Sequence, residues 1–133
     1  LHWHLLQYPT HRGMQECVKA MNHFYLQNGS FWELDHDPKG FEWVSREDRE
    51  RCVISYLRKG RKKAHFVIHN FSQNHYREYT AELKGLEIIR EVFNSDEERF
   101  MGEGITNAHF AGGASLSLAP FVTAIFEVDF ESE

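Results

Sequence analysis

Two short acidic runs are the first places where this chain could carry acid–base chemistry. One is Asp35-His36-Asp37, just before Pro38, and the other is Asp96-Glu97-Glu98, just after Asn94-Ser95. Twenty Asp and Glu among 133 residues make such neighbours common by chance. Asp and Pro favour local turn bonding, and acidic side chains favour the first turn of a helix, so both runs are predicted to be surface structure. We assign no catalytic residue in this chain.

Nine histidines raise the question of a metal site. His2 and His4 would share a face if residues 1–5 form a strand, and His65 and His69 would share a face of a later strand. Two ligands on one strand need a third group, and no carboxylate has the spacing to supply it. We therefore expect structural histidines and no metal site.

The cysteines and glycines indicate no redox centre and no cofactor. Cys17 and Cys52 both occupy apolar positions, so a disulfide framework, a zinc site and a reactive thiol are all unexpected, and a reducing compartment is favoured. The runs Gly102-Glu103-Gly104 and Gly112-Gly113 lack the strand–loop–helix context of a nucleotide-binding motif.

Trp43 is the candidate substrate-binding residue. A neutral polysaccharide offers no charge to attract, so a binding surface relies on aromatic rings flanked by hydrogen-bonding groups. Phe41 and Trp43 are two residues apart on one predicted strand and therefore point to the same face. If that face is exposed, Trp43 with Glu42 or Arg46 can hold a sugar chain, and if it is buried, Trp43 is a core residue.

Composition limits the possible partners. The formal charge of −5 argues against a nucleic-acid partner, and the one basic run, residues 58–63, is predicted to be the solvated connection of a hairpin. No run of about 18 apolar residues and no signal-peptide pattern occurs, so we expect no membrane partner and a cytoplasmic location. The first residue is Leu1 and not Met, which we interpret as a cut inside a longer protein.

One amphipathic helix is predicted near the N-terminus, within residues 5–29. Its apolar residues follow the helical i, i+3, i+4, i+7 pattern: Met14, Cys17, Val18, Met21, Phe24 and Tyr25. We expect Thr10 to cap its start after Pro9, and Asn28-Gly29 to end it with a residue of positive φ. The apolar stripe needs a surface to bury it.

From residue 41 onward the pattern changes to short β-branched and aromatic runs separated by turn residues. Seven such runs are predicted strands: 41–44, 52–58, 64–71, 76–83, 86–93, 114–118 and 122–128. Seven or eight strands at this spacing indicate a mainly β fold, an antiparallel β-sandwich preceded by one amphipathic helix.

Several blocks of the chain, in order, resemble bacterial 1,4-α-glucan (glycogen) branching enzymes of the α-amylase superfamily. They are Leu5-Leu6, His11 to Gln15, Phe31 to Asp37, Gly40 to Val44, Val53 to Arg58, Asn70-Phe71, Arg90 to Asp96 and Ser115 to Pro120. The resemblance covers essentially the whole chain. The span from Gly102 to Ala114 looks shorter than in that family.

The resemblance implies a domain division and a role. Residues 1–31 resemble the last strand-to-helix segment of a (β/α)₈ catalytic barrel, and residues 32–133 resemble the C-terminal all-β domain. The family cuts an α-1,4 linkage and forms an α-1,6 linkage with carboxylates at the ends of barrel strands, which would precede Leu1. We therefore expect an inactive piece of a branching enzyme that stabilises the barrel, with the barrel and an α-glucan such as glycogen or amylose as partners. Trp3 and Trp32 are expected at the junction with the barrel.

Two alternatives stay open at this stage. The chain can be a stand-alone carbohydrate-binding β-sandwich module, which requires an exposed aromatic strip. It can also be the C-terminal domain of another α-amylase superfamily enzyme.

Overall fold

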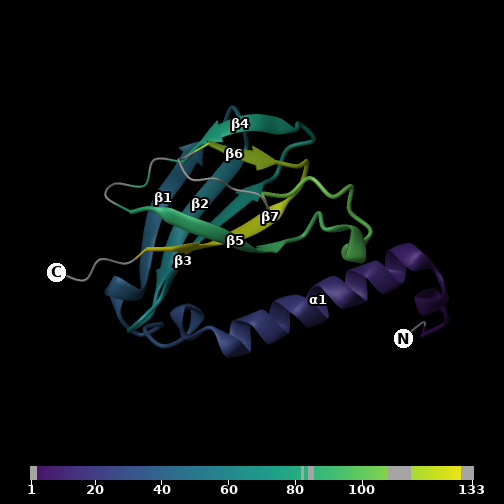
Figure 1. The fold of residues 1–133 in the computed structure, drawn as a ribbon, viewed down its shortest axis with the longest axis horizontal. Helices are drawn as coiled ribbons and strands as arrows, with labels where there is room; N and C mark the ends of the chain where they lie inside the picture. Colours follow the sequence, from purple (N-terminus) through teal and green to yellow (C-terminus); the bar gives the residue numbers. More distant parts are fainter. Residues whose placement is uncertain (1–2, 82, 84–85, 108–114, 130–133) are drawn as a thin grey trace.

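The computed structural model describes residues 3–81, 83, 86–107 and 115–129. Three layers are stacked in it: helix α1, a five-stranded sheet and a two-stranded sheet (Figure 1). The helices are η1 (Trp3–Gln7), α1 (Pro9–Gln27), η2 (Gly29–Phe31), η3 (Pro38–Gly40) and η4 (Glu98–Phe100), all 3-10 except α1. The strands are β1 (Phe41–Asp48), β2 (Val53–Lys59), β3 (Ala64–Asn70), β4 (Tyr76–Thr80), β5 (Ile88–Asn94), β6 (Ser115–Leu118) and β7 (Thr123–Val128).

The predicted mainly β fold is confirmed, with one helix followed by seven antiparallel strands in two sheets. The large sheet has the order β1-β2-β3-β7-β5, and the small sheet pairs β4 with β6. The basic run does connect a hairpin, because Lys59 pairs with Ala64 and the Gly60 N–H donates to the Lys63 carbonyl at 2.8 Å. Of the span from Gly102 to Ala114, residues 108–114 lie outside the described part of the chain.

The alternation of side chains divides the apolar residues into two cores. Side chains on one face of β2 and β3, such as Leu57 and Phe66, pack with Phe126 of β7 and with residues of the small sheet. Val67 and Ile125 point to the opposite face, where α1 covers them. We call this second face the outer face of the large sheet.

Helix α1 ends differently from the prediction at both termini. Pro9 is the first helical residue, Tyr8 is the N-cap and no side chain caps it, so the Thr10 cap is wrong. Proline suits the first helical position because its φ is already helical and it has no N–H to satisfy. Asn28 has φ −121°, and its amide Nδ2 donates to the Phe24 carbonyl at 2.8 Å, which satisfies the helix end without a residue of positive φ.

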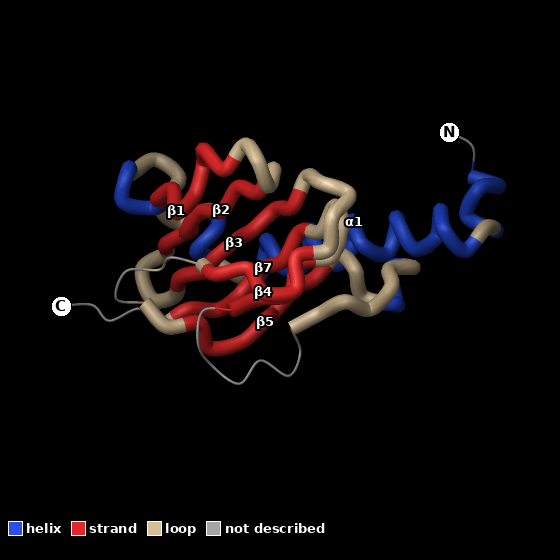
Figure 2. The backbone as a smooth tube through the Cα atoms, turned by 90° about the horizontal axis from the view of Figure 1, so that it is seen from above, coloured by secondary structure: helices blue, strands red, loops and turns tan. Residues whose placement is uncertain are grey.

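Figures 1 and 2 both show the N-terminal half of α1 projecting beyond the sheets. The strand considered for residues 1–5 is not found in the described segment Trp3–Gln7, which is the 3-10 helix η1.

Candidate functional site

Trp43 lies on β1, at the edge of the large sheet. It pairs with Tyr56 of β2, and its ring centroid is 5.1 Å from that of Phe41. The two rings therefore share the outer face, as the spacing predicted. Trp43 is 45% exposed, so the condition for a binding role, an exposed face, is met.

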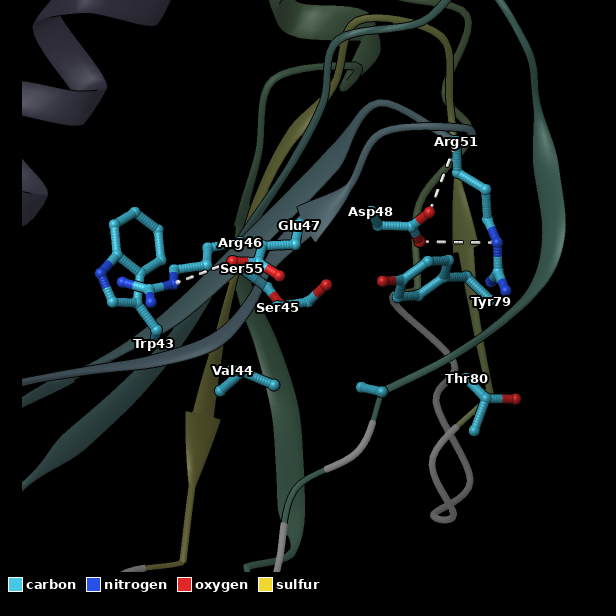
Figure 3. A pocket seen from close by; sticks show the side chains of 11 residues that line it. Trp43, Val44, Ser45, Arg46, Glu47, Asp48, Arg51, Ser55, Tyr79 and Thr80 are labelled. Atoms are coloured by element: carbon cyan, nitrogen blue, oxygen red, sulfur yellow. Dashed lines mark hydrogen bonds and ion pairs between the residues drawn. The ribbon is translucent and has the colours of Figure 1, made fainter.

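A cleft of about 620 Å³ opens beside Trp43, between the second half of β1 and the end of β4 (Figure 3). Irregularities in the β1–β2 register after Trp43 and after Ser45 locally disrupt the pairing of this edge. Trp43 lies at one end of the cleft in Figure 3, and Tyr79 and Thr80 lie at the other. Residues far apart in sequence thus share one hollow.

The cleft presents mainly polar side chains. Arg46 forms a loose ion pair with Glu47 at 3.9 Å, and Arg51 forms one with Asp48 at 3.5 Å. The Arg51 guanidinium also lies 5.5 Å from the ring centroid of Tyr79. These pairs place donors and acceptors of both charges within one hollow, which suits a neutral ligand rich in hydroxyl groups.

Ser55 is the least exposed residue that lines the cleft, with 1% of its surface accessible. Among the described residues its hydroxyl Oγ has no hydrogen-bond partner.

Of the two polar neighbours predicted for Trp43, only Arg46 lines the cleft. Glu42 pairs with Lys59 at 2.6 Å and is not among the cleft residues. Arg51, Ser55 and Tyr79 were not predicted, because the sequence shows no signal that brings β2, β4 and the β1–β2 turn to one place.

A row of rings continues from Trp43 across the outer face. Tyr56, His69 and Phe71 follow in turn. The distance between neighbouring ring centroids is 6.0 Å from Trp43 to Tyr56, 5.6 Å from Tyr56 to His69 and 5.8 Å from His69 to Phe71. Phe71 is 60% exposed. We call Trp43, Tyr56, His69 and Phe71 the ring row.

Four carboxylates of the acidic runs have partners within the fold. Asp37 accepts from the Lys39 N–H at 2.9 Å, and Asp35 pairs with Arg58. Asp96 accepts from the Ile105 N–H at 2.9 Å, and Glu97 pairs with Arg99 at 2.8 Å. The Asp37 and Glu97 contacts are those of turns, whereas Asp35 and Asp96 hold segments that are 23 and 9 residues away along the chain.

His65 and His69 form hydrogen bonds within the fold, whereas Cys52 is exposed in the turn between β1 and β2 and does not occupy the predicted apolar position. His65 and His69 do point to the same outer face of β3, as predicted, but each bonds to a hydroxyl of another residue. No group of three or more metal-ligating side chains gathers within the described ranges. Cys17 is half-buried, and burial raises the pKa of its thiol, so the thiolate is disfavoured.

No helix in the described part of the chain combines the length and apolarity needed to cross a bilayer.

Helix α1 carries two parallel apolar stripes. Cys17, Ala20 and Phe24 pack on the outer face of the sheet. The second stripe is exposed and consists of Met14, Val18, Met21 and Tyr25. Its last three residues each directly follow a residue of the first stripe in the sequence. The 4-3-4 spacing of this exposed stripe is that of a helix that packs on another element. The predicted stripe is therefore only partly buried within this chain.

A family model described as "Alpha amylase, C-terminal all-beta domain" matches residues 43–129. The chain belongs to the α-amylase C-terminal all-β domain family. The matched region runs from Trp43 to the end of β7 and so contains the sandwich without α1.

The sequence relatives of this α-amylase C-terminal domain extend across α1 as well. The 1,4-alpha-glucan branching enzyme GlgB of Protochlamydia amoebophila is 40% identical over 137 residues, which cover 96% of this chain and 19% of the relative. The enzymes of the same name from Aquifex aeolicus and Oceanobacillus iheyensis are 39% and 33% identical, over 91% and 100% of this chain. This chain spans about a fifth of the length of these relatives. The resemblance to the C-terminal region of branching enzymes is confirmed.

Solved structures agree on the fold. The trehalulose synthase MutB from Pseudomonas mesoacidophila MX-45 matches 75% of this chain and 17% of its own, with 20% identity and a TM-score of 0.51. The isomaltulose synthase SmuA from Protaminobacter rubrum matches 68% and 14%, with 16% identity and a TM-score of 0.52. At these identities the likeness concerns the all-β architecture alone.

Proposed function

We propose that this chain is the C-terminal part of a cytoplasmic 1,4-α-glucan branching enzyme, and that it braces the catalytic barrel and contacts the glucan. Residues 1–31 would be the last strand-to-helix segment of the barrel, and residues 32–133 the C-terminal all-β domain. The chain itself would be inactive, because the carboxylates that cut and re-form glucosidic bonds would belong to the barrel.

The observation that carries the bracing role is the pair of stripes on α1. One stripe binds the helix to its own sheet, through Cys17, Ala20 and Phe24. The other, from Met14 to Tyr25, presents apolar side chains to solvent. Exposed apolar stripes of this length on a single helix mark interaction surfaces, and a barrel would cover this one. Trp3 and Trp32, which are also exposed, lie beside the two ends of the helix.

The observation that supports a glucan contact is the exposed Trp43 ring at the rim of a polar cleft. Sugar C–H faces pack on aromatic rings, and hydroxyl groups need donors and acceptors nearby. Arg46 and Asp48 offer such groups within the same hollow. The charged side chains of the cleft form pairs of opposite sign, Arg46 with Glu47 and Arg51 with Asp48, which fits an uncharged ligand.

A co-expression experiment tests the bracing role. The barrel-containing four fifths of the Protochlamydia amoebophila relative would be produced with this chain as a separate polypeptide. We expect a stable complex that branches amylose, whereas this chain alone leaves the iodine absorbance of amylose unchanged. Replacing Met14 and Val18 by Lys should abolish the complex, and an undiminished complex would contradict the proposal.

A second candidate function, a stand-alone carbohydrate-binding module, is favoured by one observation. The ring row has an exposed ring at each end, Trp43 and Phe71, joined by the half-buried rings of Tyr56 and His69, and so provides part of the aromatic strip that such a module requires. The discriminating test is the affinity for maltoheptaose: a stand-alone module would bind it tightly without a barrel, and a bracing domain would bind it weakly. The exposed stripe of α1 has no use in a stand-alone module.

A further inference from the structure

We propose that Tyr56 and His69 are positioning residues that hold the indole ring of Trp43 in one orientation at the rim of the cleft. This inference rests on the proposed glucan-binding role of Trp43 and names the residues that prepare its ring for the sugar. Neither residue lines the cleft itself.

The indole ring of Trp43 packs edge-to-face against two other rings, those of Phe41 and Tyr56. Its centroid is 5.1 Å from that of Phe41 and 6.0 Å from that of Tyr56, with interplanar angles of 86° and 87°. These edge-to-face arrangements are the ones that aromatic rings favour. Phe41 and Tyr56 also stack on each other, with their centroids 5.1 Å apart and an interplanar angle of 28°. A shift of Tyr56 would therefore move both contacts of the indole.

Tyr56 is in turn fixed by a chain of hydrogen bonds across three strands. Its hydroxyl lies 3.0 Å from Nε2 of His69, and Nδ1 of His69 lies 2.9 Å from Oγ1 of Thr123. The Thr123 N–H donates to the Ser95 hydroxyl at 2.9 Å. β2, β3 and β7 are adjacent in the sheet, so these hydrogen bonds run from the strand next to the β1 edge across the central strand β3 to β7.

Packing alone does not require these hydrogen bonds between Tyr56, His69 and Thr123. A Phe at position 56 would fill the same space without a hydroxyl that needs a partner, and a half-buried hydroxyl or imidazole is costly unless it is bonded. A neutral His69 donates from one ring nitrogen and accepts at the other, which is what a relay between two hydroxyls needs. Burial lowers the pKa of His69, which favours this neutral form. The bonds fix the direction of the Tyr56 ring, and that direction sets the orientation of Trp43.

The mobility of the Trp43 indole tests the inference directly. The chain contains three Trp, whose ¹⁵N indole signals can be told apart, and the Trp43 signal is identified by its loss in Trp43→Phe. We expect its heteronuclear NOE to match that of the sheet backbone in the unchanged chain and to fall in His69→Leu. His69→Gln keeps a donor and an acceptor and should restore it.

Two further variants complete the design. Tyr56→Phe removes one hydroxyl only, so it serves if His69→Leu fails to fold, and it should also loosen the indole. His75→Leu is the matched control, since His75 bonds to Ser117 at 3.0 Å on the small sheet, away from Trp43. We expect it to leave the indole signal unchanged. An unchanged NOE of Trp43 in both His69→Leu and Tyr56→Phe would overturn the inference.

A sugar titration separates this inference from the function on which it rests. If the ring contact matters for the glucan, His69→Leu should raise the Kd for maltoheptaose about threefold, by loss of part of one aromatic contact. Full affinity in Trp43→Ala would instead refute the glucan role of Trp43. The NOE experiment contains no sugar, so it decides the positioning role in either case.

Discussion

Gly13 lies against the main chain of Phe100, and a β-carbon built on Gly13 would be 2.8 Å from the Phe100 carbonyl oxygen. It would also be 2.7 Å from Cγ of Met101. The close approach joins α1 to η4, and through η4 to the end of β5. Gly13 is also the one residue of α1 that is fully buried.

We expect Gly13→Ala to destabilise the chain, against the helix propensity of alanine. Alanine favours a helix interior by about 1 kcal/mol over glycine. The clash with the Phe100 carbonyl forces a backbone shift that costs about 1 to 3 kcal/mol, so the net effect is a loss. Urea unfolding measures it. Asn22→Ala, at an exposed position of the same helix, is the control and should leave stability unchanged or slightly raised; a stabilised Gly13→Ala would show that the contact is not tight.

We expect the stability contributed by His65 to fall as the pH falls. Its ring is 2% exposed, its Nδ1 is 2.6 Å from the Ser30 hydroxyl, and it stacks on Phe31 at 5.3 Å. Burial lowers the pKa of His65 from 6.5 to about 4, with a smaller opposing effect from Glu127 and a further lowering by Lys63. The unfolded chain therefore takes up the proton first, so the contribution is complete above pH 6.5 and is lost as the pH falls toward 4.

The free energy of unfolding of His65→Gln, measured from pH 8 to pH 4 beside the unchanged chain, isolates this effect from that of the carboxylates. The difference between the two chains should shrink steadily below pH 6.5. A difference that stays constant over this range would mean that His65 titrates alike in the folded and unfolded states.

We expect Trp43→Ala to weaken the binding of maltoheptaose about tenfold, the loss of one stacked aromatic contact of roughly 1 to 1.5 kcal/mol. Isothermal titration calorimetry measures it. Trp32 is the matched control because it is 45% exposed, the same as Trp43, but lies beside α1 and away from the cleft. Equal losses in Trp32→Ala and Trp43→Ala would argue against a site at the cleft.

We expect the two stripes of α1 to respond differently to substitution. Phe24→Ala should destabilise the chain by about 2 to 3 kcal/mol, less than for a fully buried Phe, because Phe24 is half-buried against Phe31 and Phe93. Met14→Gln should change stability by less than about 0.5 kcal/mol, since Met14 is exposed.

The same pair of variants should separate folding from association. Analytical ultracentrifugation of the isolated chain at increasing concentration is expected to show self-association through the exposed stripe, reduced in Met14→Gln. A monomer at all concentrations, together with an unchanged complex with the barrel, would show that the exposed stripe is not an interaction surface.

The long helix and the seven strands could be predicted from the sequence in their order along the chain, because the signals for them are local. The period of two predicted that Phe41 and Trp43 share one face, and the period of 3.6 predicted the apolar residues of α1 as a single set, without Ala20 and without their division into two stripes. Local signals did not determine the ends of α1, since Tyr8, Pro9 and Asn28 offer alternatives to the caps that the pattern suggested.

Which of these faces are covered became clear only from the three-dimensional packing of the elements. Whether Trp43 is core or surface depends on what packs over β1, and the edge position with its irregular pairing leaves the ring half open. The gathering of Ser55 and Tyr79 beside it depends on strand order, which is set by contacts between residues distant in the chain. Burial depends on such long-range contacts, so it could not be predicted from the sequence. Periodicity depends on residues that are close in the chain, so it could be.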